Sequence, residues 1–145
     1  MRPLILDVTL SIPLQTVYDA FISPELLQQW FRPLGMTVQQ AMSNPTEEGK
    51  FVLRLSDDMN NIHTLEGYYL KVIPNQRLQF TWHWLDEDHK SQVEINFTEI
   101  NEGTTQIQLK HSNFDDEEDY NLHYQAWIMC LEELSVVLGG LSAQH

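Results

Sequence analysis

His123 is the side chain in this sequence with the clearest potential for chemistry, because its polar ring interrupts an otherwise apolar helical pattern. In a helix over residues 120–141, at about 100° per residue, one broad face collects Ala126, Trp127, Cys130, Leu134, Val137, Leu138 and Leu141. His123 lies near the middle of this face, one turn before Trp127. Apolar surroundings and a helix N-terminus both favour the neutral imidazole, which could donate to a ligand carbonyl or accept from a ligand hydroxyl. The alternative is a buried histidine bonded to a neighbour, either His111 or Glu66.

A second group of candidates follows from the alternation of side chains in the strands expected upstream. We expect one row of each strand to face the helix, and the polar members of these rows include Glu66, Tyr68 and His111. A buried Glu66 could act as a general base, whereas the alternative, which we favour, is an exposed position at the rim of the sheet. An aromatic cavity wall with a few polar groups is typical of small-molecule sites, whereas a filled core is the alternative. The residues expected to contact a ligand are Tyr68, Phe80, Trp82, Trp84, Phe97, His111, His123 and Trp127.

No other pattern in the sequence indicates catalysis or metal binding. The six histidines are scattered, and none forms a helical i, i+4 pair with a glutamate or a compact set with cysteine. The sequence contains neither a glycine-rich phosphate loop nor a nucleophile elbow. Cys130, the single cysteine, is interpreted as a buried apolar residue rather than a nucleophile. We therefore expect no metal and no cofactor, and we assign no catalytic residue.

Composition restricts the class of protein further. The length of 145 residues suits one domain over 1–145, and an apolar content of 42% is enough for a core. Lys and Arg number 8 against 21 Asp and Glu, a net charge of −13 that argues against nucleic acid or an anionic membrane as a partner. We expect no signal peptide and no membrane span. A lone cysteine forms no internal disulfide, so we expect a cytoplasmic protein.

Periodicity predicts the elements that must position these side chains. Alternation over residues 4–12 predicts a strand with one buried face, and Pro13 can open a short helix after it. Ser23, Pro24 and Glu25 are typical of the start of a second short helix. Further strands separated by short turns are predicted at 37–42, 51–55, 63–73, 78–84, 93–98 and 105–111.

These elements predict an α+β fold. About six to seven antiparallel strands form a sheet with one apolar face, which needs a second layer, and the long last helix has the matching stripe. A curved sheet wrapped around this helix leaves a cavity if side chains do not fill it. The acidic run 115–119 lies where negative charge suits the helix dipole, although a surface for a basic partner is an alternative.

The order and spacing of these segments resemble the START-like helix-grip superfamily, also called SRPBCC. Within it they resemble the Aha-type family, the homologues of the activator of the ninety-kilodalton heat-shock protein ATPase. The segments that carry the resemblance are IPLQTVYDAF (12–21), SPELLQQWF (23–31), EGYYLKVIP (66–74), RLQFTW (77–82), SQV (91–93) and GTT (103–105), with His111, His123 and Trp127. The resemblance covers nearly the whole chain and implies a helix-grip fold. In many members it also implies a cavity for an apolar or amphipathic small molecule.

The resemblance has two limits. The eukaryotic activator carries an additional chaperone-binding domain before this one, and we expect no counterpart in these 145 residues. That departure weakens the expectation of co-chaperone activity. Glu48 and Gly49 stand where members often show paired glycines. The family has no universal catalytic motif, so the resemblance assigns no catalytic role.

Three functions remain open on the sequence. The first, which we favour, is a module that binds an apolar or amphipathic small molecule, with polarity from His123, His111 and Tyr68. The second is an activator-like partner of a chaperone that uses the acidic surface. The third is an enzyme of cyclase, dehydratase or hydrolase type that uses His123 or Glu66 for proton transfer. Both a monomer and a homodimer are compatible with the sequence.

Overall fold

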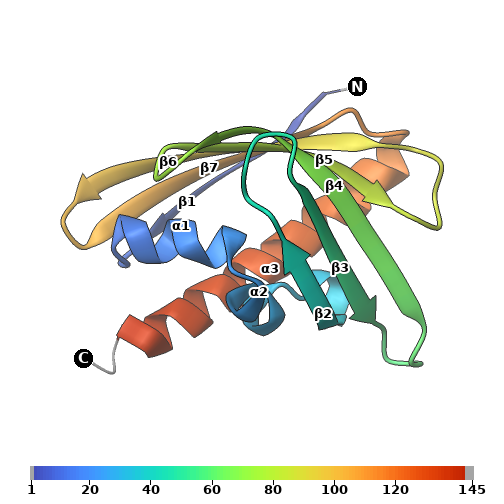
Figure 1. Ribbon diagram of the computed structural model, residues 1–145, viewed down its shortest axis with the longest axis horizontal. Helices are drawn as coiled ribbons and strands as arrows, with labels where there is room; N and C mark the ends of the chain where they lie inside the picture. The colour runs from blue at the N-terminus through green and yellow to red at the C-terminus, as the bar shows by residue number, and fades with distance from the viewer. Residues whose placement is uncertain (1, 143–145) are drawn as a thin grey trace.

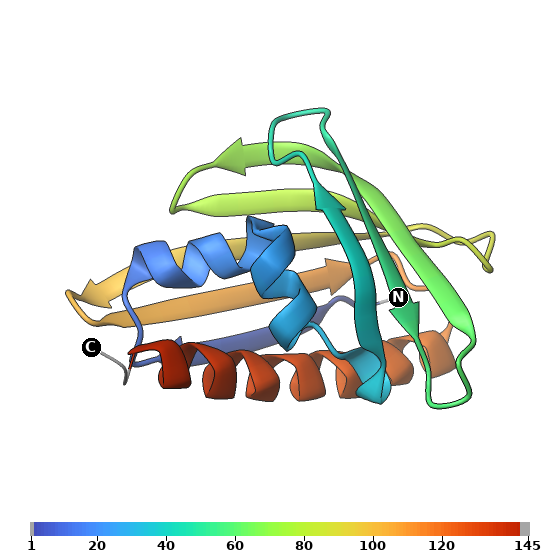
Figure 2. The same cartoon turned by 60° about the horizontal axis from the view of Figure 1, so that its bottom comes forward.

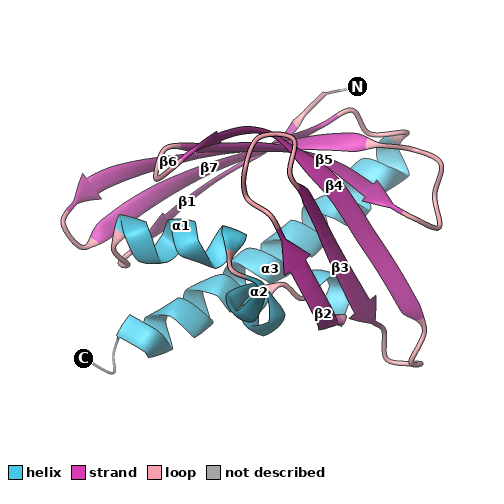
Figure 3. Cartoon of the chain, in the orientation of Figure 1, coloured by secondary structure: helices cyan, strands magenta, loops and turns pink. Residues whose placement is uncertain are grey.

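A curved antiparallel sheet and a long helix dominate the computed structural model, which describes residues 2–142 (Figure 1). The helices α1, α2 and α3 all lie on the same face of the sheet (Figure 3). This arrangement confirms the α+β class, the long C-terminal helix and the two short helices after the first strand. In chain order, the elements are β1 (Leu4–Leu10), α1 (Leu14–Ile22), α2 (Pro24–Trp30), the 3-10 turn η1 (Pro33–Gly35), β2 (Thr37–Ser43), β3 (Lys50–Ser56), β4 (Ile62–Ile73), β5 (Arg77–Trp84), β6 (Ser91–Asn101), β7 (Thr104–Ser112) and α3 (Glu117–Ser142).

The seven strands follow the order β1-β7-β6-β5-β4-β3-β2, and every neighbouring pair is antiparallel. Short turns join β2 to β7 as a meander, and β1 completes the sheet by pairing with β7, where Leu4 lies opposite His111. The sheet bends over α3 (Figure 2). No helix among residues 2–142 is long and apolar enough to cross a membrane.

The apolar face of α3 packs against the sheet as the periodicity predicts. Its buried residues are Trp127, Cys130, Leu131, Leu134 and Leu138. Leu141, which we also expected on this face, lies outside the residues whose side chains the structure describes. The helix begins at Glu117, three residues before the predicted start, because Asp116 Oδ1 accepts a hydrogen bond from Asp119 N at 2.8 Å. The acidic run thus caps the helix.

The predicted inward row of β4 is wrong. Tyr69 is buried, at 3% exposed, whereas Tyr68 is 48% exposed and points outward. The cause is an irregularity in the pairing with β5 between Tyr69 and Lys71, which reverses the parity along the strand. Val72 packs against the core beyond this irregularity, although it has the same parity as the exposed Tyr68 and Leu70.

Glu66 shares the outward face of β4, in agreement with the exposed position that we favour over a buried base. Its carboxylate pairs with Lys50 Nζ at 3.2 Å across the neighbouring strand β3. Glu66 is therefore not placed to act as a base inside the sheet, and it makes no contact with His123. The predicted inward rows of β5, β6 and β7 are confirmed by the burial of Leu78, Phe80, Trp82, Val93, Ile95, Phe97, Ile107, Leu109 and His111.

Candidate functional site

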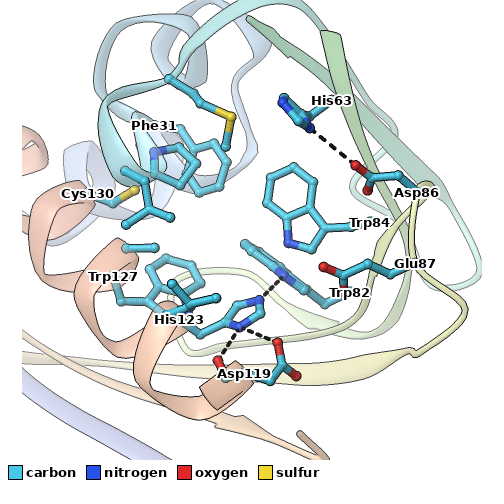
Figure 4. Close-up of a pocket in the computed structure, with 15 residues that line it drawn as sticks. Phe31, His63, Trp82, Trp84, Asp86, Glu87, Asp119, His123, Trp127 and Cys130 are labelled. Carbon is cyan, nitrogen blue, oxygen red and sulfur yellow. Dashed lines mark hydrogen bonds and ion pairs between the residues drawn. The ribbon is translucent and has the colours of Figure 1, made fainter. Parts of the chain in front are cut away.

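A pocket of about 240 Å³ lies where the end of β5, the turn η1 and the first half of α3 meet (Figure 4). We call it the main pocket. The sheet supplies His63, Trp82 and Trp84, and the helix supplies Asp119, Leu122, His123, Ala126, Trp127 and Cys130. The remaining lining residues are Phe31, Pro33, Leu34 and Met36 around η1, and Asp86 and Glu87 in the turn after β5.

The turn η1 closes one side of the main pocket with an unusual backbone. Leu34 has φ 53° and Gly35 has φ 82°, both in the left-handed region. A left-handed conformation costs a bulky residue about 1–3 kcal/mol, so it persists where the surroundings enforce it. The sharp turn places Phe31, Leu34 and Met36 along the same wall.

Trp82 is the centre of an aromatic cluster in the main pocket. Its ring centroid lies 5.2 Å from that of Trp127, 5.9 Å from that of Phe31 and 6.2 Å from that of Trp84. A smaller space of about 40 Å³, the inner cavity, lies on the other side of Phe31, Trp82 and Trp127, and Phe80 contributes to its wall. These three shared rings form a partition between the two spaces.

The hydrogen bonds of His123 determine its tautomer. Trp82 Nε1 donates to His123 Nε2 at 3.3 Å, and since an indole N–H only donates, Nε2 must carry a lone pair. The proton of the neutral ring is then on Nδ1, which donates to the carbonyl oxygen of Asp119 at 2.9 Å. The alternative of a histidine bonded to neighbours is thus what the structure shows, with Trp82 and Asp119 as the partners in place of His111 or Glu66.

His111 lies behind the main pocket rather than in its lining. Trp127 Nε1 donates to His111 Nδ1 at 3.0 Å, so Nε2 carries the proton and donates to Ser91 Oγ at 2.7 Å. Complete burial lowers the pKa of His111 well below its usual value of 6.5. The two histidines therefore hold the indoles of Trp82 and Trp127 in fixed orientations.

His63 joins two loops at the edge of the main pocket. Its Nε2 lies 3.0 Å from Asp57 Oδ2, and its Nδ1 lies 3.3 Å from Asp86 Oδ2. The hydrogen bond with Asp57, supported by Asp86, raises the pKa of His63 above 6.5. In the same contact, the bond from His63 lowers the pKa of the Asp57 carboxyl to about 2.

Carboxylates occupy one end of the main pocket. They belong to Asp86, Glu87 and Asp119, and Figure 4 shows them away from Phe31 and Cys130. Partial desolvation, and secondarily the charge of Asp119, raise the pKa of Glu87. An open depression, the acidic groove, continues outward from this end and is lined by Glu87, Asp88, His89, Asp115, Asp116, Glu118, Asp119 and Leu122.

The cysteine in the lining is not activated. Cys130 is 1% exposed, and burial raises the pKa of its thiol to about 12. A nucleophilic cysteine needs the thiolate near neutral pH, so Cys130 belongs to the apolar wall. Within residues 2–142, no group of three or more His, Cys, Asp and Glu side chains is arranged to hold a metal ion.

Comparison of the sequence with models of known protein families gives a match over residues 11–139. The family is described as activator of Hsp90 ATPase homolog 1-like protein. The chain belongs to this family. The match begins directly after β1 and ends in the last turn of α3, so it includes every lining residue of the main pocket. Among curated proteins, none matches this Aha-type chain significantly.

Solved structures share the fold of this Aha-type chain. Protein CV1439 from Chromobacterium violaceum superposes with a TM-score of 0.86 at 21% identity, over 95% of this chain and 98% of the other. The AHSA1 protein SPO3351 from Silicibacter pomeroyi gives 0.83 at 22% identity, over 99% and 100% of the two chains. PFC0360w, described as an HSP90 activator from Plasmodium falciparum, gives 0.77 at 19% identity, over 96% and 97%. At these identities the likeness establishes the fold alone.

The structure brings half of the expected ligand contacts into the main pocket. Trp82, Trp84, His123 and Trp127 line it together. Phe80 lines only the inner cavity, His111 supports Trp127 from behind, and Tyr68 lies on the outer surface. Phe97 packs against Tyr18 and Phe21 of α1, with ring centroids 5.3 Å and 5.6 Å away. Ligand contact itself stays a prediction for all eight residues.

Sequence reasoning missed several residues of the lining. Phe31 and Met36 flank a turn whose path depends on two left-handed residues. Asp86 and Glu87 lie in a turn, and the acidic composition of this turn indicates only that it is exposed to solvent. His63 begins a long strand, and no local pattern indicates that Asp57 and Asp86 meet it from two different loops.

Proposed function

We propose that this Aha-type chain binds an apolar or amphipathic small molecule in the main pocket. The observation that carries this proposal is a pocket of about 240 Å³ whose walls include Trp82, Trp84 and Trp127. Pockets for drug-sized ligands measure about 300–1,000 Å³, so the expected ligand is small. A cytoplasmic location is part of the same proposal.

The hydrogen bonding of the walls favours an apolar body for this ligand. The indole N–H groups of Trp82 and Trp127 are already bonded to His123 and His111. Both nitrogens of His123 are bonded as well. These groups therefore present mainly carbon surfaces to the pocket, and an apolar ligand would bury them without leaving a donor or acceptor unpaired.

Native mass spectrometry of freshly purified protein, with solvent extraction of any released compound, tests the proposal. A reproducible additional mass that extraction identifies as a small apolar or amphipathic compound supports it. Ala126 lines the pocket, so Ala126→Phe should fill the space and abolish the additional mass. Gln125→Phe places the same ring on the exposed side of α3 and serves as the matched control. An additional mass that persists unchanged in Ala126→Phe would contradict binding at this site.

A chaperone is the second candidate partner, and the family itself favours it. The family description names an activator of an Hsp90 ATPase, and the Plasmodium falciparum protein is described as an HSP90 activator. The acidic groove offers a surface that could meet basic residues of such a partner. Co-elution with an Hsp90 chaperone at low salt, lost as salt rises, would support this function. Separate elution at low salt would count against it.

Catalysis receives less support from the geometry. Glu66 lies on the outer face of β4, and both ring nitrogens of His123 are engaged by neighbours. Replacing His123 with Ala separates the two functions, since a binding protein would keep a weakened affinity while a catalyst would lose turnover with binding largely intact.

A further inference from the structure

We propose that the ligand of the main pocket is a cationic amphiphile, with an apolar body among the tryptophans and a protonated amine facing Asp86, Glu87 and Asp119. This inference rests on the proposed function, because it specifies the chemical class of ligand for the same pocket.

The charges in the pocket lining are the first argument. Among the 15 described residues that line the main pocket, three are carboxylic acids and none is lysine or arginine. All three carboxylates belong to the same end of the pocket, since Glu87 and Asp119 also line the acidic groove and Asp86 adjoins Glu87 in the chain. A ligand with a carboxylate or phosphate would place like charges together here, whereas an amine would meet opposite charge.

The histidines in the lining do not cancel this charge. His63 is shared between Asp57 and Asp86, so even when protonated it leaves the trio with a net negative charge. His123 accepts a hydrogen bond at Nε2 from Trp82, which requires the neutral ring. Asp119 therefore receives a hydrogen bond from a neutral imidazole rather than an ion pair.

Glu87 is the carboxylate most available to a ligand. Among residues 2–142 no hydrogen bond or ion pair engages the Glu87 side chain, whereas Asp86 contacts His63 and Asp119 contacts His123. Desolvation and the negative charge of Asp119 both disfavour the ionised form of Glu87, so its pKa is raised. An ammonium group between Glu87 and Asp119 would offset the repulsion between the two carboxylates and favour the ionised form of Glu87.

The aromatic rings suit the same ligand. Trp82 and Trp84 are nearly perpendicular, with an interplanar angle of 86°, so together they present two walls of a corner. Tryptophan faces attract an ammonium within about 6 Å of the ring centroid, in addition to their contact with an apolar chain. The acidic groove outside the pocket extends the negative field over the entrance, which favours the approach of a cation.

Three probes of equal chain length test the inference in the intact protein. Octylammonium, 1-octanol and octanoate share one apolar body and differ in the charge of the head group. We expect calorimetric titration at neutral pH to give an affinity for octylammonium about tenfold above that for octanol, since one charged hydrogen bond supplies about that factor. Octanoate should bind most weakly, and added salt should reduce the preference for the amine.

A pair of charge-removing variants locates the effect. Glu87→Gln should reduce the preference for octylammonium over octanol several-fold. Glu102→Gln removes the same charge from the distant turn between β6 and β7 and should leave the preference intact. An equal loss in both variants would assign the preference to overall charge and overturn the inference.

The outcomes separate this inference from the function on which it rests. Octanol binding as tightly as octylammonium, or octanoate binding most tightly, overturns the cationic head group and leaves small-molecule binding standing. Failure of all three probes to bind, with an unmodified mass in native spectrometry, refutes the proposed function as well.

Discussion

Replacing His111 with Gln should remove the loss of stability that protonation of this imidazole causes between pH 7.5 and pH 5. Glutamine can keep both hydrogen bonds, because its carbonyl oxygen accepts from Trp127 Nε1 and its amide donates to Ser91 Oγ. It cannot take up a proton. The variant therefore separates the hydrogen-bonding role of His111 from its titration.

The expected magnitude follows from the lowered pKa of His111. Below pH 6.5 the unfolded chain protonates this imidazole and the folded chain does not, so the free energy of unfolding falls as pH falls. No contribution is expected well above pH 6.5, where the ring is neutral in both states. The loss reaches about 1.4 kcal/mol per pH unit, or up to about 2 kcal/mol between pH 7.5 and pH 5.

Urea unfolding at several pH values measures this difference. We expect the gap between wild type and His111→Gln to shrink by up to about 2 kcal/mol from pH 7.5 to pH 5, equivalent to about 6 °C in Tm for a chain of this size. Other groups titrate equally in both proteins, so the subtraction isolates His111. A constant gap across this range would refute the reasoning, because it would mean that the folded state protonates His111 as readily as the unfolded chain.

Three further predictions concern other parts of the fold. Gly67→Ala should destabilise the protein by about 3 kcal/mol in urea unfolding, because an added Cβ would lie 2.0 Å from a backbone oxygen, whereas Gly103→Ala, with open space, should change little. The pKa of His63, raised by its bond to Asp57, should fall toward 6.5 in Asp57→Asn when followed by NMR titration, and an unchanged midpoint would contradict the contact. Cys130, buried with a pKa of about 12, should resist a thiol reagent in the native protein and react fully in concentrated guanidinium, so rapid native labelling would contradict its burial.

The sequence was sufficient to predict the fold where each strand has one uninterrupted apolar row. Leu78, Phe80 and Trp82 alternate without exception along β5, so burial follows directly from parity. In β4, apolar side chains occur at both odd and even positions. An irregularity in the pairing with β5 decides which of these two sets faces the core. Gly67 was the available signal, because a glycine within a strand often marks a close backbone approach, here to Thr81.

The candidate site could be predicted only in part, for a different reason. Periodicity predicts the positions of Trp82 and Trp127, because Trp82 points from the sheet toward the helix and Trp127 points from the helix toward the sheet. The acidic end depends on the path of turns, where Glu87 and Asp119 approach each other from elements separated by two strands in the chain. Turn composition specifies a reversal of the chain but not the direction in which its side chains point.

The partition of three rings has a consequence for the size of the ligand proposed for the main pocket. Two of its members, Trp82 and Trp127, are anchored by hydrogen bonds to histidines, so turning either indole would cost a buried polar contact. Phe31 has no polar atom and can rotate at the expense of packing alone. A molecule too long for the main pocket would therefore displace Phe31 and extend into the inner cavity beside Phe80. On the proposed function, Phe31 would set the upper limit on the chain length of the ligand, and residue 31 is the position where substitution would change that limit.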